Sequence, residues 1–205
     1  MELAFFFVVL LFSVIMHEYM HGWVAYRLGD PTARNAGRLT LNPIPHIDPF
    51  MTIIVPLVLY FSTGFILGGA KPVPVNPLNF RRPRKGMMLV GAAGPATNLA
   101  LGVGFALFYH LLKLTGLMQP AMATGLVGAV FINTILAFFN LIPVPPLDGS
   151  RIVAGLLPRD AAMAYDRVGQ FGLFIVIGLI MFGAFRLIAG PALVYTSWLL
   201  GVQLS

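Results

Sequence analysis

Three ionisable side chains lie close together in the run His17-Glu18-Tyr19-Met20-His21. In an α-helix, residues four apart lie one turn apart on the same face, so His17 and His21 can bind one metal ion. Glu18 lies about 100° around the helix from His17. There its carboxylate can hold a water molecule beside the metal and take its proton. This H-E-x-x-H pattern predicts a site of zinc-dependent hydrolysis.

A match to a five-residue pattern can arise by chance, but the surroundings favour a metal site here. Residues 3–16 contain no ionisable side chain, and three then follow within five positions. At membrane depth an unpaired charge costs about 2.5–3.5 kcal/mol or more. Because binding a cation offsets that cost, we predict that the cluster holds a metal ion.

Catalytic zinc commonly has three protein ligands and an open position, so the sequence must supply one ligand more. The chain has no cysteine, and its one glutamate besides Glu18 is Glu2, many helical turns before the histidines. A glutamate third ligand is therefore excluded. The candidates are the other histidines and the aspartates, namely His46, His110, Asp30, Asp48, Asp148, Asp160 and Asp166.

Asp148 is the candidate that we favour. It follows the stretch 114–147, which has no ionisable side chain, and the proline-rich run 143–146. Prolines cannot continue a regular helix, and freed backbone is tolerated at membrane depth only where it lines protein or a wet cavity. The alternative is that Asp148 only caps a helix that begins at Gly149.

The composition indicates what kind of fold must position these residues. Hydrophobic residues make up 58% of the 205 residues and charged residues only 10%, whereas a typical soluble domain has about 25% charged residues. The chain is therefore expected to be an integral membrane protein. Thirteen Lys and Arg stand against seven Asp and Glu. Basic loops beside apolar spans explain this excess, so no nucleic-acid partner is expected.

Six apolar stretches approach the length of about 20 residues that crosses a bilayer as a helix. They are 3–26, 49–70, 86–109, 117–141, 168–185 and 187–203. The first lacks the basic start and the cleavage site of a signal peptide, so we expect it to be retained. The sequence contains no internal repeat that would divide these stretches into separate domains. We predict a single domain over 1–205, with a zinc-site core over about 1–150 and additional helices over 151–205.

The predicted zinc site constrains the topology. If His17 and His21 meet Asp148, four consecutive full crossings are forbidden, because they would place the aspartate on the opposite side. If instead 49–70 enters and returns, every basic residue except Lys113 and Arg186 shares one face, as the positive-inside rule favours. The alternative is a fully spanning 49–70, with extended backbone returning the aspartate to the zinc.

We therefore predict an all-α polytopic membrane protein of five to six transmembrane helices. A re-entrant or short β-like segment is expected between the first helix and the helix that carries Gly-Pro-x-x-Asn. The N-terminus is expected outside, and the active site toward the cytoplasmic side of the cell membrane.

Four motifs make the chain resemble the site-2 protease family of intramembrane zinc metalloproteases, along nearly its whole length. They are the H-E-x-x-H at 17–21, Ala-Lys-Pro-Val-Pro at 70–74, Gly-Pro-Ala-Thr-Asn at 94–98, and the 140–149 run that ends in Leu-Asp-Gly. The first and last are highly specific together. The chain differs from many members in carrying no PDZ or CBS module and little sequence before the first motif.

The resemblance implies an endopeptidase that hydrolyses peptide bonds within or near transmembrane segments of its substrates. It implies that His17, His21 and Asp148 bind one Zn²⁺ and that Glu18 is the general base and acid. It also implies that Asn140 holds the unwound substrate or the developing oxyanion, with Asn98 supporting the site. Expected partners are a transmembrane substrate and the lipid bilayer; a second copy of the chain or a regulatory membrane protein is left open.

Several readings stay open from the sequence alone. The proline-rich 71–79 segment either pairs with an unwound substrate as an added strand or is a membrane-surface loop. His46 and Asp48 either assist zinc entry or are structural. A rival function is a transporter or channel that uses the His/Glu/Asp cluster as a metal or proton relay. The H-E-x-x-H pattern with a late aspartate favours hydrolysis, and an intact Glu18 argues against a non-catalytic scaffold.

Overall fold

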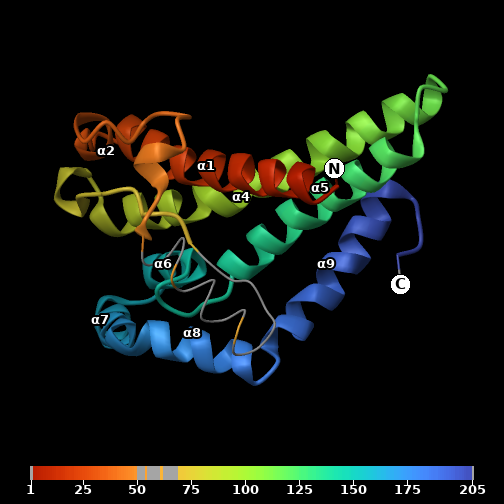
Figure 1. Ribbon diagram of the computed structural model, residues 1–205. Helices are drawn as coiled ribbons and strands as arrows, with labels where there is room; N and C mark the ends of the chain where they lie inside the picture. The colour runs from red at the N-terminus through yellow and green to blue at the C-terminus, as the bar shows by residue number, and fades with distance from the viewer. Residues whose placement is uncertain (1, 50–53, 55–60, 62–68, 205) are drawn as a thin grey trace.

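The computed structural model describes residues 2–49, 54, 61 and 69–204, and these residues are predominantly helical, with no strand among them (Figure 1). Within these described residues, three helices are long and apolar enough to cross a membrane: α1 (Glu2–Arg27), α4 (Pro83–Leu114) and α5 (Pro120–Asn140). They coincide with the predicted stretches 3–26, 86–109 and 117–141. The all-α class is therefore confirmed, and the chain is a multi-pass membrane protein.

Shorter elements connect and follow these three helices. Between α1 and α4 lie α2 (Thr32–Asn35) and the 3-10 turns η1 (Ile44–His46) and η3 (Pro77–Asn79). After α5 come α6 (Asp148–Leu156) and α7 (Arg159–Val168). Most of the predicted 49–70 stretch lies outside the described residues, so its re-entrant or β-like course stays a prediction.

The predicted span 168–185 is not one continuous helix. After α7 the chain forms the 3-10 turn η4 (Gly169–Phe171) and then α8 (Gly172–Met181). At 1.5 Å per residue, a helix of that length covers about 15 Å, half of the hydrocarbon core. Gly183, with φ of 83°, then makes the turn into α9 (Ala184–Leu200), which matches the predicted 187–203. The count of five to six spans therefore stays a prediction.

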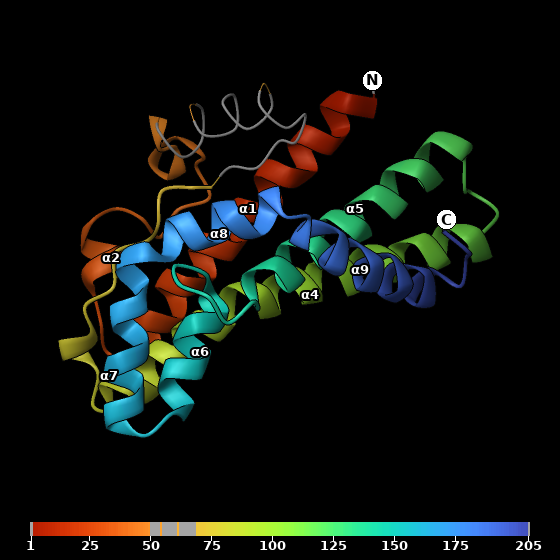
Figure 2. The same ribbon diagram turned by 90° about the horizontal axis from the view of Figure 1, so that it is seen from below.

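Helix α4 lies at the centre of the bundle and packs against α1, α5 and α6, while α9 packs along α5 (Figures 1 and 2). Small residues allow the close approach that helix packing in a membrane requires. In α5, a Cβ at Gly125 would lie 2.9 Å from the ring of Phe5 in α1, and one at Gly128 would overlap the ring of Phe6. Both α4 and α5 begin at a proline, whose missing N–H costs nothing in the first helical turn.

Polar side chains fill part of the interface between α1, α4 and α5. Ser13, Asn98, Asn133 and Thr134 are all 0–1% exposed. Buried polar groups that bond across helices hold membrane bundles together and fix their register. Asn98 of α4 does so here, since its Nδ2 donates to the Ser13 carbonyl of α1 at 3.3 Å and to Asn133 Oδ1 of α5 at 3.1 Å. The Asn98 amide therefore links the three long helices beside the predicted zinc site.

Candidate metal centre

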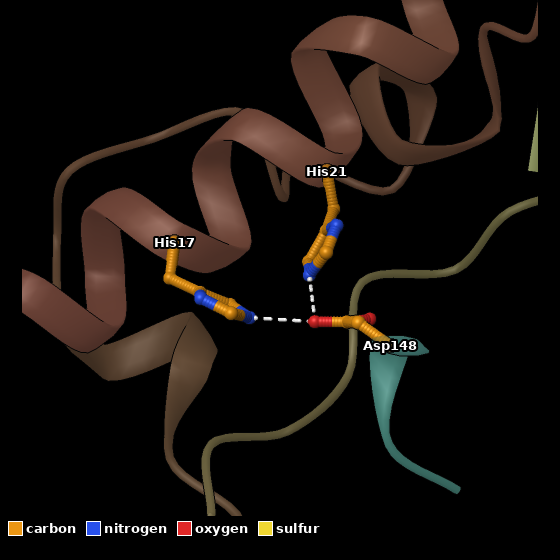
Figure 3. A group of neighbouring side chains, drawn as sticks. All are labelled: His17, His21 and Asp148. Carbon is orange, nitrogen blue, oxygen red and sulfur yellow. Dashed lines mark hydrogen bonds and ion pairs between the residues drawn. The ribbon is translucent and has the colours of Figure 1, made fainter. Parts of the chain in front are cut away.

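His17 and His21 of α1 meet Asp148, the first residue of α6, in one buried cluster (Figure 3). One ligand atom from each residue lies within 4.8 Å of the other two. Asp148 Oδ2 is 3.0 Å from His17 Nε2 and 3.1 Å from His21 Nε2. The structure thus brings together the three residues that the sequence predicted as ligands.

The two imidazole rings are held by acceptors on their far sides. His21 Nδ1 lies 2.6 Å from the Val90 carbonyl oxygen, and His17 Nδ1 lies 2.6 Å from Asn98 Oδ1. Oxygen atoms of this kind only accept, so each Nδ1 carries a proton, and the Nε2 of each neutral ring presents a lone pair. Metal-binding histidines almost always donate their other N–H in this way. Two lone pairs and a carboxylate oxygen therefore converge, an arrangement that a cation stabilises.

Two segments position Asp148, the proline-rich loop before α6 and the helix α7 that follows α6. Tyr165 of α7 donates its hydroxyl to the Pro143 carbonyl at 2.6 Å, which fastens the proline-rich loop. Helix α6 has no side-chain cap hydrogen bond, so Asp148 does not serve as the cap considered above. Its carboxylate turns instead toward the histidines, and Arg151 Nη1 approaches the second oxygen, Oδ1, at 3.4 Å.

Gly94 of α4 leaves the space that an ion needs. A Cβ at this position would lie 2.5 Å from His21 Nε2 and closer still to His17 Nε2. Because zinc binds histidine nitrogen at about 2.0–2.1 Å, a methyl group here would occupy much the same volume as the ion. Two imidazoles and a carboxylate are also ligand types that zinc takes. The residues present therefore fit a zinc ion.

Glu18 is half-buried and contacts the 71–79 segment, whose first six residues are neither helix nor strand. The backbone N–H of Val73 donates to Glu18 Oε2 at 3.1 Å. The start of the segment is tied to the chain before residue 49. Arg38 Nη2 donates to the Lys71 carbonyl at 2.5 Å, and the Lys71 N–H donates to the His46 carbonyl at 2.8 Å. The segment is thus held directly beside the predicted base.

The far end of the 71–79 segment is tied to Asp30, whose carboxylate is completely buried. It accepts hydrogen bonds from the Asn76 backbone N–H at 2.7 Å, from Asn79 Nδ2 at 2.7 Å and from the Thr32 hydroxyl at 2.5 Å. Burial alone would raise the pKa of Asp30. The hydrogen bonds from Thr32, Asn79 and Asn76 outweigh burial and lower its pKa from the ordinary value of 3.8. Asp30 therefore anchors this segment, and among the described residues it lies outside the cluster of His17, His21 and Asp148.

The remaining candidates lie outside the cluster of three. His46 Nε2 faces the Thr40 carbonyl at 2.9 Å, and His110 Nε2 faces the Leu199 carbonyl at 2.8 Å. Asn140 donates its Nδ2 to the Leu136 carbonyl of its own helix at 2.9 Å. Among the described residues, the cluster does not extend to Asp48, nor to Asp160 and Asp166, which are exposed on α7.

Sequence reasoning did not identify three of the residues at this centre. Gly94 belonged to a recognised motif, but its closeness to both histidines is a tertiary contact. Val73 contributes only its backbone, so no side-chain pattern marks it. Asn133 did leave a signal, because it is a polar residue within the apolar stretch 117–141, and such residues commonly bond between helices.

An H-E-x-x-H helix that faces a carboxylate from a later helix, inside an all-α membrane protein, is typical of membrane-embedded zinc metalloproteases. Comparison with known proteins agrees with this class. The family model described as peptidase family M50 matches residues 117–183. No solved structure matches the chain.

Curated relatives carry the likeness over most of the chain. It is 40% identical over 177 residues to "Putative zinc metalloprotease YwhC" of Bacillus subtilis, which covers 84% of this chain and 78% of the relative. It is 31% identical to "Putative zinc metalloprotease Rip2" of Mycolicibacterium smegmatis, over 83% of this chain and 64% of that relative. The chain therefore belongs to peptidase family M50, the site-2 protease family, and is a zinc metalloprotease.

Proposed function

We propose that the chain is an intramembrane endopeptidase that hydrolyses peptide bonds within or near transmembrane segments of other membrane proteins. The observation that carries this proposal is the buried cluster of His17, His21 and Asp148. Glu18 directly follows the first of these ligands in the sequence. Two of these ligands lie on α1, a helix long and apolar enough to span a membrane. Family membership favours hydrolysis over the transport function considered from the sequence.

In this proposal His17 Nε2, His21 Nε2 and Asp148 Oδ2 hold the ion. Bound zinc supplies a Lewis acid that polarises the scissile carbonyl and makes water a nucleophile at neutral pH. The Glu18 carboxylate takes a proton from the attacking water and delivers it to the leaving amine. The N–H of Val73, already bonded to Glu18 Oε2, fixes the direction of that carboxylate.

The 71–79 segment is the proposed docking site for the substrate backbone. A substrate helix satisfies its own backbone groups, so it must unwind locally before hydrolysis. Residues 71–76 have an irregular course, and no strand pairs with them in the part of the chain that the structure describes. An unwound peptide can therefore add along them as a strand and reach Glu18. The hydrogen bonds at Lys71 and Asp30 keep the segment in place for this role.

Two asparagines are proposed to assist. Asn98 orients His17 because its Oδ1 accepts a hydrogen bond from the Nδ1–H. Asn140, at the end of α5, is proposed to hold the unwound substrate or the developing oxyanion. Its Nδ2 donates to the Leu136 carbonyl, so this role requires the amide to turn away from its own helix.

We also propose that the site faces the cytoplasm, with the N-terminus outside and a single domain of zinc-site core and additional helices. The end of α1 lies beside the start of α4, because His21 contacts Val90. The Lys71 N–H meets the His46 carbonyl, so the chain between them starts and ends at one level. These contacts favour the re-entrant over the fully spanning alternative. The basic residues flanking these ends then lie on the side that the positive-inside rule assigns to the cytoplasm.

The test is to purify the chain in detergent, measure bound zinc, and compare the native protein with Glu18→Gln on a panel of single-span substrates. We expect one zinc per chain in both proteins. Cleavage is expected to fall about 10²–10⁴-fold in the variant, because a general base of this kind contributes that factor. Cleavage that survives in Glu18→Gln, or native protein that binds no zinc, would contradict the proposal.

A further inference from the structure

A line of buried amides runs from His17 into the centre of the bundle. His17 Nδ1 contacts Asn98 Oδ1 at 2.6 Å, and Asn98 Nδ2 contacts Asn133 Oδ1 at 3.1 Å. Asn133 Nδ2 in turn contacts the Ala129 carbonyl oxygen at 2.9 Å. Both asparagines are 0% exposed. The line therefore connects a ligand on α1 with a backbone carbonyl of α5, through a side chain of α4.

Each end of this line fixes the direction of the amides within it. A backbone carbonyl can only accept, so Asn133 must present its NH₂ to Ala129 and its Oδ1 to Asn98. Because Oδ1 only accepts, Asn98 must present its own NH₂ to Asn133. Its other amide hydrogen points to the Ser13 carbonyl at 3.3 Å, which is also only an acceptor. Asn98 Oδ1 is then left facing His17, and it requires a proton on His17 Nδ1.

We infer that Asn133 is a positioning residue for the metal centre, which sets the proton of His17 on Nδ1 by fixing the orientation of Asn98. The Nε2 lone pair of His17 then faces the ion. This inference rests on the proposed role of His17 as a ligand. If Asn98 turned over, its NH₂ would face His17 and favour the proton on Nε2, and His17 could not bind a metal ion.

The two histidines differ in how they are secured. His21 is held by the Val90 backbone carbonyl, which no side-chain substitution reverses. His17 depends on two side-chain amides, each of which can turn over. The Ser13 carbonyl gives Asn98 a second anchor, so loss of Asn133 weakens the orientation without abolishing it. We therefore expect a smaller effect from Asn133 than from Asn98.

The first test measures zinc affinity of the full chain in detergent, by competition with a chromogenic chelator. Loss of an outer partner of a metal ligand costs about 10–100-fold in affinity, which is the effect expected for Asn98→Ala. Asn133→Leu is expected near or below the lower end of that range, at roughly 3–10-fold. The double variant is expected to bind no more weakly than Asn98→Ala alone, because Asn133 acts through Asn98.

Two further variants control for packing. Thr134→Val changes the neighbouring buried polar residue, whose hydroxyl donates to the Val130 carbonyl of its own helix at 2.9 Å, and native affinity is expected. Asn133→Asp keeps an oxygen toward Asn98 whichever way it turns, and when protonated it can still donate to Ala129. It is expected to bind zinc more tightly than Asn133→Leu.

The second test reads the proton directly, from ¹⁵N chemical shifts of the histidine rings in metal-free protein, with His17 assigned by its loss in His17→Ala. Native His17 is expected with its proton on Nδ1, and Asn133→Leu with a mixture of both forms. The same form in both proteins, or zinc affinity of Asn133→Leu equal to that of Thr134→Val, would overturn the inference. Native protein without bound zinc would instead overturn the proposed function, while the ring shifts would still test Asn133.

Discussion

Two aspartates of this chain are buried, and their surroundings are opposite in kind. The carboxylate of Asp30 receives N–H and O–H donors from Thr32, Asn76 and Asn79. The Oδ2 of Asp148 faces the Nε2 atoms of His17 and His21, which carry lone pairs when the rings are neutral, because the Nδ1 of each ring donates to an oxygen on its far side. Both residues were candidates for the third ligand from sequence alone, and burial does not separate them, since they are 0% and 6% exposed.

What separates them is whether the carboxylate is already satisfied. A buried carboxylate pays for its desolvation only when donors or a cation surround it. Asp30 has enough donors, so it fastens the 71–79 segment to the end of α1. Asp148 Oδ2 lies between two Nε2 atoms that are acceptors in the neutral rings, so beside neutral histidines it needs a cation. We therefore predict that Asp30 stabilises the fold and that Asp148 binds the metal ion. The substitutions below test these two roles separately.

The largest effect is expected from Asp148→Ala. Removal of one ligand out of three should weaken zinc binding by more than the roughly 100-fold that loss of an outer partner costs, and cleavage should be lost with the metal. Zinc content by atomic emission measures this directly. His46→Ala, which removes a buried histidine outside the cluster, is the control and should leave zinc content unchanged. Full zinc occupancy in Asp148→Ala would remove the distinction between the two aspartates.

Gly94→Ala should also weaken zinc binding, although it removes no ligand. Its Cβ would stand 2.5 Å from His21 Nε2, so we expect zinc affinity to fall roughly 10–100-fold. Gly104→Ala is a matched control on the same helix, because a Cβ there meets nothing within 4 Å. The control should be neutral or stabilise α4 by up to about 1 kcal/mol. Equal zinc affinity in both variants would show that the ion lies elsewhere.

Asp30→Ala should instead lower the stability of the fold. It leaves the Asn76 N–H and the Asn79 amide without their acceptor, which should lower the free energy of unfolding by about 2–4 kcal/mol. Zinc stoichiometry of the folded protein should not change. The measurement is denaturant unfolding in detergent, with the exposed Asp160→Ala as control at less than about 0.5 kcal/mol. Loss of zinc from folded Asp30→Ala protein would contradict the structural role.

The smallest expected effect is a change with pH in the contribution of Asp30 to the free energy of unfolding. The pKa of Asp30 is lowered on folding, so its stabilisation is fully present above the ordinary value of 3.8 and is lost as the pH falls through the lowered, folded-state value. For metal-free protein, the stability difference between native and Asp30→Ala should be constant from about pH 5 to pH 8 and should shrink below about pH 4. A stability difference that grows as the pH falls would contradict a lowered pKa of Asp30 in the folded protein.

The sequence was most informative where a residue type is costly in a membrane. His17, Glu18 and His21 stand out in an apolar helix, and Asp148 stands out after a long uncharged stretch, so the cluster of three could be predicted. The all-α class and the three long helices followed from hydropathy. The break of 168–185 into a short α8 could not be read from hydropathy, because the stretch from Val168 through η4 and α8 contains no charged side chain.

The contacts that orient the site were not predictable in the same way. The role of Asp30 depends on backbone and amide donors more than forty residues later in the chain. The bond from Val73 to Glu18 involves a backbone N–H, which has no signature in residue type. Gly94 matters because of the two rings beside it, and only the packing of α1 on α4 shows that.

X-ray absorption at the zinc edge of the purified native protein counts the ligands of each type, and so tests whether His17, His21 and Asp148 hold the ion. We expect two imidazole nitrogens at about 2.0–2.1 Å, with oxygen in the remaining positions. Sulfur is not expected, since the chain has no cysteine. A spectrum that requires one imidazole, or three, would show that the zinc is not held by His17, His21 and Asp148.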